Sequence, residues 1–189
     1  IGRPVPRSFD RMQLLCVYAA DLDGIGAEGR DGFAERLDRA LRRQGDGDYS
    51  LTFVDLGDIG QLRALGLDEE SIRGFTSQVE DELRKASVDG RTAERVEDGR
   101  YGLLTKRGSN LDALRESLEA RARDIDPQGQ ALKIATSSVD LDLDALEDED
   151  TLDALRHAVD VFADGGLDAV IFDDLAGAGL ALANRRQDR

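Results

Sequence analysis

A short polar turn carries the residues of this sequence that are best placed for chemistry: Glu97, Asp98, Gly99, Arg100 and Tyr101. The residues on both sides favour β-strands, so residues 91–106 are predicted to form a hairpin with this turn at its tip. A hairpin lifts its turn out of the sheet, where two acids and an arginine can act without disturbing the core. The same composition is typical of a solvated surface turn, so both interpretations stay open at this point.

The elements that must position this turn follow from the spacing of apolar residues. Strands are predicted at 51–56, 132–139 and 169–172, beside the hairpin. Four helices are predicted, and Ser109 or Asn110 is expected to cap the third of them. Helices between strands, with an embedded hairpin, predict an α/β fold: an α+β sandwich with a mixed central sheet covered by helices. The apolar residues at helical spacing are Phe33, Leu37, Ala40 and Leu41; Ile72, Phe75, Val79 and Leu83; Leu111, Leu114 and Leu118; and Leu152, Leu155, Val159 and Phe162.

The composition limits the number of domains and the class of partner. The chain has 189 residues, of which 40% are apolar, so it can bury one core but not two full domains. A formal net charge of −15 repels nucleic acid and anionic membrane surfaces, and we expect neither as a partner. The apolar run 14–20 is too short to span a bilayer, so we expect a cytoplasmic protein. One cysteine, Cys16, and one histidine, His157, leave few options for zinc or a histidine-based triad.

Three polar residues that are far apart in the sequence could together form a phosphoryl-transfer site. Asp21 opens a DLDG sequence after an apolar run, and Thr136 and Asp173 lie where predicted strands end. This set resembles the haloacid dehalogenase phosphatases, which implies Asp21 as the nucleophile that accepts a phosphoryl group. Ile25-Gly26 departs from that family's pattern, and no lysine is assigned to neutralise the phosphate. Such a phosphatase is kept as an alternative function.

A longer series of motifs runs through the chain in a fixed order. The first motif is a set of residues at fixed spacing that begins at Asp21. It is followed by the strand segment Phe53-Val54-Asp55-Leu56 and then by the hairpin from Arg95 to Leu104. Over about residues 21–172 the series resembles GGDEF domains, the diguanylate cyclase family, with Tyr101 in place of the family's phenylalanine. The resemblance implies a fold like that of nucleotide cyclases and polymerase palms, with Asp55 beside the hairpin turn. The opening pattern consists of Asp21-Leu22-Asp23-Gly24-Ile25, Arg30, Phe33, Leu37 and Leu41.

The hairpin departs from the family where the family binds metal. In the GGDEF family, two magnesium ions bind the GTP phosphates. They are held by an aspartate of the first strand and by an acid in the third position of the hairpin motif. Asp55 keeps the first ligand, but Gly99 stands in the third hairpin position and Arg100 replaces the next acid. Glu97 and Asp98 replace the two glycines that admit the substrate, and their charges repel a triphosphate. We expect Arg100 to pair with Asp55 or Asp98 in place of a metal.

The positions that read the nucleotide are changed as well. Arg63 and Ser71 align near the family's guanine-reading residues, and Val159 aligns with its phosphate-binding lysine. The resemblance leaves Asp55, Arg63 and Ser71 as a residual metal or nucleotide groove, with Asp55 as a weak metal ligand. No cofactor is assigned, and magnesium with GTP is disfavoured.

These departures together predict a degenerate, non-catalytic GGDEF-like domain at residues 21–172, between a lead-in or linker at 1–20 and a connecting helix at 173–189. In the family such domains act as regulatory, GTP-sensing or protein-interaction modules of cyclic di-GMP signalling. The partners that the resemblance implies are an adjacent EAL phosphodiesterase or other output domain in a longer polypeptide, and a second copy in a homodimer. An active diguanylate cyclase is the remaining alternative.

Overall fold

The computed structural model describes residues 27–45, 47–141 and 148–172. The predicted lead-in at 1–20 and connecting helix at 173–189 lie outside the described residues, and so do Asp21, Asp173 and Cys16. The helices are α2 (Ala27–Gln44), α3 (Ile59–Ala64), α4 (Glu69–Ala86), α5 (Leu111–Ile125) and α6 (Asp148–Phe172). The strands are β1 (Tyr49–Gly57), β2 (Ala93–Glu97), β3 (Arg100–Lys106) and β4 (Leu132–Leu141).

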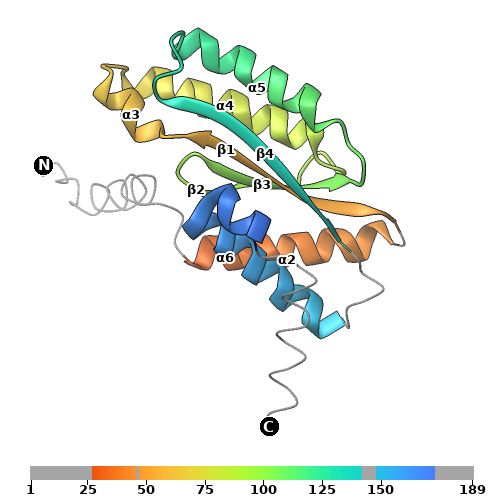
Figure 1. Ribbon diagram of the computed structural model, residues 1–189. Coiled ribbons are helices and arrows are strands. Elements are labelled where there is room, and N and C mark those ends of the chain that lie inside the picture. The colour runs from red at the N-terminus through yellow and green to blue at the C-terminus, as the bar shows by residue number, and fades with distance from the viewer. Residues whose placement is uncertain (1–26, 46, 142–147, 173–189) are drawn as a thin grey trace, which may run out of the picture.

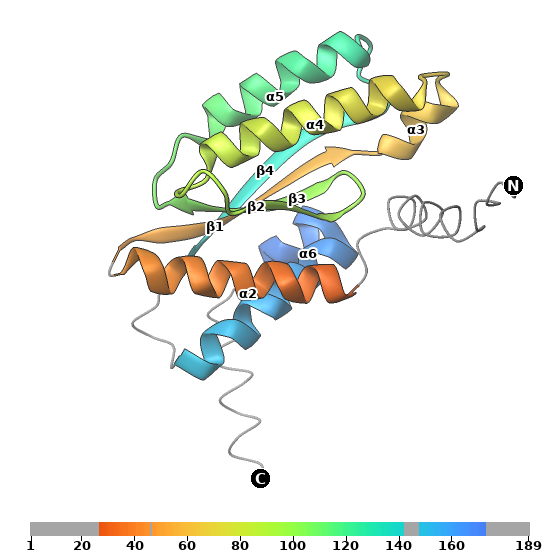
Figure 2. The same ribbon diagram turned by 180° about the vertical axis from the view of Figure 1, so that it is seen from behind.

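The central sheet has the strand order β2-β3-β1-β4. Helices α4 and α5 cover one face and α2 and α6 cover the other, as Figures 1 and 2 show. The predicted α+β sandwich is therefore confirmed. The sheet itself is not mixed, since every neighbouring pair of the described strands runs antiparallel.

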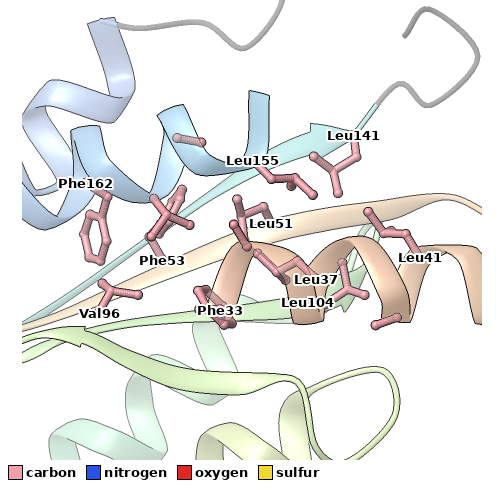
Figure 3. Close-up of a cluster of buried hydrophobic side chains, with 14 of the residues drawn as sticks. Phe33, Leu37, Leu41, Leu51, Phe53, Val96, Leu104, Leu141, Leu155 and Phe162 are labelled. Carbon is pink, nitrogen blue, oxygen red and sulfur yellow. The ribbon is translucent and has the colours of Figure 1, made fainter. Parts of the chain in front are cut away.

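Strand β1 is buried on both faces and connects the two halves of the core. Leu51 and Phe53 belong to the apolar cluster under α2 and α6, whereas Val54 and Leu56 belong to the cluster under α4 and α5. Phe53 packs against Phe162 of α6 with their ring centroids 4.5 Å apart (Figure 3). Burial on both faces is the reason why this strand reads as a continuous apolar run in the sequence.

The last predicted strand, 169–172, is wrong, because these residues form the end of α6. The helix is interrupted at Gly166, where φ is 69° and ψ is −163°. Four apolar residues fit a short buried strand and a turn of helix equally well, so periodicity alone does not separate them.

Side chains cap the starts of three helices, and Asp58 accepts a hydrogen bond from the Gln61 amide at 3.0 Å at the start of α3. Asn110 accepts a hydrogen bond from the Ala113 amide at 3.0 Å, which confirms its predicted role at the start of α5. Asp68 accepts one from the Ser71 amide at 2.8 Å at the start of α4. Within the described residues, none of the helices has the length and apolar character needed to cross a membrane.

Asp126 is a buried carboxylate that joins the end of α5 to the start of β4. It accepts hydrogen bonds from the backbone amides of Leu132 at 2.8 Å, Ala131 at 2.8 Å and Gln130 at 3.0 Å. The bond from Leu132 is the main cause of a pKa below the usual aspartate range. The ionised form of Asp126 therefore stabilises the fold.

We predict that Asp126→Asn lowers stability near pH 7 and reduces its loss in acid. Because the folded-state pKa is depressed, the contribution is present above the unfolded value of about 3.9 and is lost as the pH falls through the folded value. Urea unfolding of both proteins between pH 7 and pH 3 measures the difference. A gap between the two proteins that stays constant across this range would contradict the prediction.

Candidate functional site

The hairpin turn, residues 97–101, is closed against the end of β1. The Leu56 amide donates a hydrogen bond to the Gly99 carbonyl at 2.8 Å. Gly99 has a φ of +75°, and a Cβ atom there would lie 2.7 Å from the Gly57 carbonyl oxygen. Only glycine fits this position, because both the backbone conformation and the close contact exclude a side chain. Asp55 lies beside this turn, as expected, because it is the register partner of Arg100.

Asp55 and Arg100 form an ion pair across neighbouring strands. They are register partners in β1 and β3, and the Arg100 Nε lies 3.3 Å from the Asp55 Oδ2. The other carboxylate oxygen, Oδ1, accepts a hydrogen bond from the Gly57 amide at 2.8 Å. Arg100 also donates to the Ala163 carbonyl of α6 at 2.5 Å. Of the two expected partners of Arg100, Asp55 is the one that it contacts.

Gly166 closes the space above this ion pair. A Cβ atom at Gly166 would lie 3.2 Å from the Arg100 Nη2 and 3.5 Å from the Asp55 Oδ2. The interruption of α6 thus brings bare backbone over the charged groups. The geometry leaves little room for a further ligand between Asp55 and α6.

Arg30 of α2 binds the other side of the hairpin turn and was not assigned this role from the sequence. Its guanidinium lies 2.7 Å from the Glu97 carboxylate, 2.8 Å from that of Asp164 and 3.9 Å from that of Asp160. Burial lowers the pKa of Arg30, but its hydrogen bonds to Asp164 and Glu97 outweigh this and raise it. Arg30 therefore stays charged and holds the hairpin turn between α2 and α6.

The remaining candidates of the nucleotide groove are engaged in local contacts. Arg63 lies 2.6 Å from the Glu69 carboxylate, and this hydrogen bond is the main cause of its raised pKa. The Ser71 amide and hydroxyl both donate to Asp68, the cap of α4. Neither residue forms a hydrogen bond or an ion pair with Asp55 or the hairpin turn, although the charge of Asp98 in the turn also raises the pKa of Arg63. The structure therefore does not bring Asp55, Arg63 and Ser71 together as one constellation.

A pair of magnesium ions does not fit these side chains. Asp55 directs one oxygen to a guanidinium and the other to a backbone amide, so a cation at Asp55 would have to displace the positively charged Arg100. Gly99 offers no side-chain oxygen, and the Glu97 carboxylate is bound to Arg30. Across the described part of the chain, no group of three or more His, Cys, Asp or Glu side chains is arranged to hold a metal ion.

Thr136, from the phosphatase alternative, lies within β4. It pairs with Val54 of an antiparallel neighbour, whereas that alternative requires it at the carboxyl end of a parallel strand. Asp21 and Asp173 lie outside the described residues. The described sheet therefore gives this alternative no structural support.

Tyr101 closes the hairpin turn on the side of α4 and α5. Its ring is buried in that half of the core, and its hydroxyl has no hydrogen-bond partner among the described residues. Burial is the main cause that raises the pKa of Tyr101. The phenol thus stays neutral and acts as an apolar side chain with one unsatisfied polar atom.

Comparisons with known proteins give one partial match of modest identity. The chain is 36% identical over 106 residues to a Thiocystis violacea protein described as "Uncharacterized 76.5 kDa protein in phbC 3'region". The match covers 54% of this chain and 15% of that relative, so the chain spans only a small part of the relative's length. No protein-family model matches the chain, and no solved structure matches it with significance.

We predict that Arg100→Ala destabilises the protein by about 1–3 kcal/mol, because it leaves a half-buried carboxylate and a backbone carbonyl without their donor. Arg63→Ala is the matched control, since it removes an exposed ion pair and should cost less than about 1 kcal/mol. Chemical denaturation of the three proteins measures both values. An equal loss in the free energy of unfolding for the two variants would show that the Asp55–Arg100 pair stabilises the protein no more than an exposed ion pair does.

Tyr101→Phe should maintain or raise stability, by up to about 1 kcal/mol, because it removes the unpaired hydroxyl and keeps the ring. Thermal unfolding followed by circular dichroism tests this prediction. A clear loss of stability would mean that the hydroxyl has a partner in solution that matters for the fold.

Proposed function

We propose that this chain is a degenerate GGDEF-like domain that does not synthesise cyclic di-GMP and acts as a regulatory or protein-interaction module in cyclic di-GMP signalling. The Asp55–Arg100 ion pair is the observation that supports this proposal most directly. It lies where the resembled family holds its catalytic magnesium ions. An arginine that compensates the first metal-binding carboxylate excludes a cation from the same position by charge and by space.

The contacts of Arg30 support a regulatory role for the hairpin turn. This residue joins the turn to α2 and to α6, the first and last helices of the described chain. A neighbouring domain that moved either helix would therefore act on the turn directly. We propose an EAL phosphodiesterase or another output domain as that neighbour, and a second copy of the chain as a further partner, in the cytoplasm.

The length of the relative is consistent with this arrangement. The region that matches the present chain makes up 15% of the relative. A small domain within a much longer polypeptide is the setting in which regulatory domains act on their neighbours.

The two enzymatic alternatives receive less support. A diguanylate cyclase needs metal ligands and an open turn, but Gly99 and Arg100 replace the ligands and the turn is closed against β1. A phosphatase with Asp21 as nucleophile needs parallel strands that deliver Thr136 to the same edge, and the described strands pair antiparallel. GTP sensing without turnover remains part of the proposal, because nucleotide binding does not require the catalytic metals.

We predict that the purified chain yields no cyclic di-GMP when it is incubated with GTP and either magnesium or manganese. Liquid chromatography of the reaction products measures this. A product that disappears in Asp55→Ala would refute the non-catalytic assignment, since Asp55 is the one family metal ligand that the chain retains.

Calorimetric titration with GTP and with cyclic di-GMP distinguishes the two non-catalytic roles. GTP binding without turnover favours a GTP sensor, and the absence of binding by either nucleotide favours a protein-interaction module.

A further inference from the structure

A second site candidate lies away from the hairpin turn, in a groove between α2 and the segment 89–94. This groove has a volume of about 570 Å³ and is lined by five arginines, which we call the arginine groove: Arg36, Arg39, Arg42, Arg43 and Arg91. Figure 2 shows α2 running under the sheet on the side of β2, whose first residues form one wall. The volume falls within the range of small-molecule pockets, about 300–1,000 Å³.

The geometry of the backbone explains why these arginines converge. Arg36, Arg39 and Arg43 follow each other at intervals of three and four residues, so they share one face of α2. Arg91 faces them from the loop before β2. Asp89 shapes that loop, because its carboxylate accepts hydrogen bonds from the Arg91 amide at 2.9 Å and the Thr92 amide at 2.7 Å.

Two of the five guanidinium groups have carboxylate partners: Arg36 pairs with Glu94, and Arg42 lies 2.8 Å from Asp38. Arg39 and Arg43 use only their Nε atoms, which donate to backbone carbonyls of α2 at 3.3 Å and 3.2 Å. Within the described part of the chain, no carboxylate lies at ion-pair distance from Arg39, Arg43 or Arg91.

This accumulation of positive charge is unfavourable for the fold alone. The chain as a whole carries a net charge of −15, yet the groove keeps a surplus of positive charge even with Asp89 and Glu94 on its wall. Like charges four residues apart on a helix, such as Arg39 and Arg43, destabilise it. The helix dipole favours cations only in the last turn, so it accounts for Arg42 and Arg43 but for none of the others.

We propose that the arginine groove binds a compact polyanion, a small molecule with two or more adjacent phosphate groups. The guanidinium group donates two parallel hydrogen bonds to a phosphate, and several of them in one hollow match a concentrated negative charge. An acidic peptide carries its charges spread along an extended chain, so it fills the same groove less well. The site is distinct from the hairpin turn, because none of the lining residues of the groove belongs to residues 97–101.

Titration calorimetry with the chain tests this proposal, with inorganic tripolyphosphate and pyrophosphate as probes. We expect saturable binding that weakens as salt is raised, with orthophosphate and a glutamate oligopeptide of equal charge binding more weakly by about tenfold or more. The absence of tripolyphosphate binding at millimolar concentration overturns the proposal. An oligopeptide that binds as tightly as tripolyphosphate also overturns it and points to a protein partner.

The location of the site is tested by the double variant Arg39→Gln/Arg43→Gln, for which we expect a loss of tripolyphosphate affinity of about tenfold or more. The matched control is Arg73→Gln/Arg123→Gln, which removes two exposed arginines from helices outside the groove and should change the affinity by less than about twofold. Equal losses in the two double variants indicate a general charge effect and overturn the site.

The single variant Arg91→Gln tests the opposite wall of the groove without changing α2. It therefore separates a loss of binding from a loss of α2 structure. The Arg91 side chain is exposed, so its removal should leave the fold intact while it weakens tripolyphosphate binding severalfold. Circular dichroism confirms the fold of each variant before titration. A folded Arg91→Gln protein with unchanged affinity overturns the proposal that both walls hold one ligand.

Discussion

The close approach between the hairpin turn and the end of β1 is the constraint on which the candidate site depends. Gly99 allows the two backbones to meet, because a Cβ atom there would collide with the Gly57 carbonyl oxygen, and the hydrogen bond from Leu56 to the Gly99 carbonyl fixes their distance. Once β1 and β3 are in this register, Asp55 and Arg100 must face each other. The ion pair is thus a product of backbone geometry and needs no separate element to assemble it.

A guanidinium at this position has a different physical role from a bound cation. It is supplied by the chain itself, and it is also held by the Ala163 carbonyl. A partly buried ion pair adds little net stability, because desolvation offsets most of the attraction. Its main effect is geometric, since it joins the sheet to α6 under Gly166 and gives the turn one defined position.

The features that could be predicted from the sequence are local or lie between strand neighbours. The hairpin follows from β-favouring residues around a polar turn. The resemblance implied that Arg100 would pair with Asp55 or Asp98, and the folded chain brings it to Asp55. The prediction of a strand at 169–172 was wrong, because a run of four apolar residues takes its conformation from its surroundings. The bridge between Arg30 and Glu97 joins residues 67 positions apart, and no local pattern relates them. The arginine groove was missed for the same reason, because its two walls meet only in the folded chain.

Arg30 ties together the two ends of the described domain. The chain enters α2 shortly before Arg30 and reaches the end of α6 shortly after Asp164, and the salt bridge between them lies beside the hairpin turn. Tension applied through the flanking chain would load this exposed bridge before it reached the hydrogen bonds of the sheet. Loss of this bridge would uncouple α6 from Arg30, while the Arg30–Glu97 pair and the hydrogen bond from Leu56 to Gly99 keep the turn against β1.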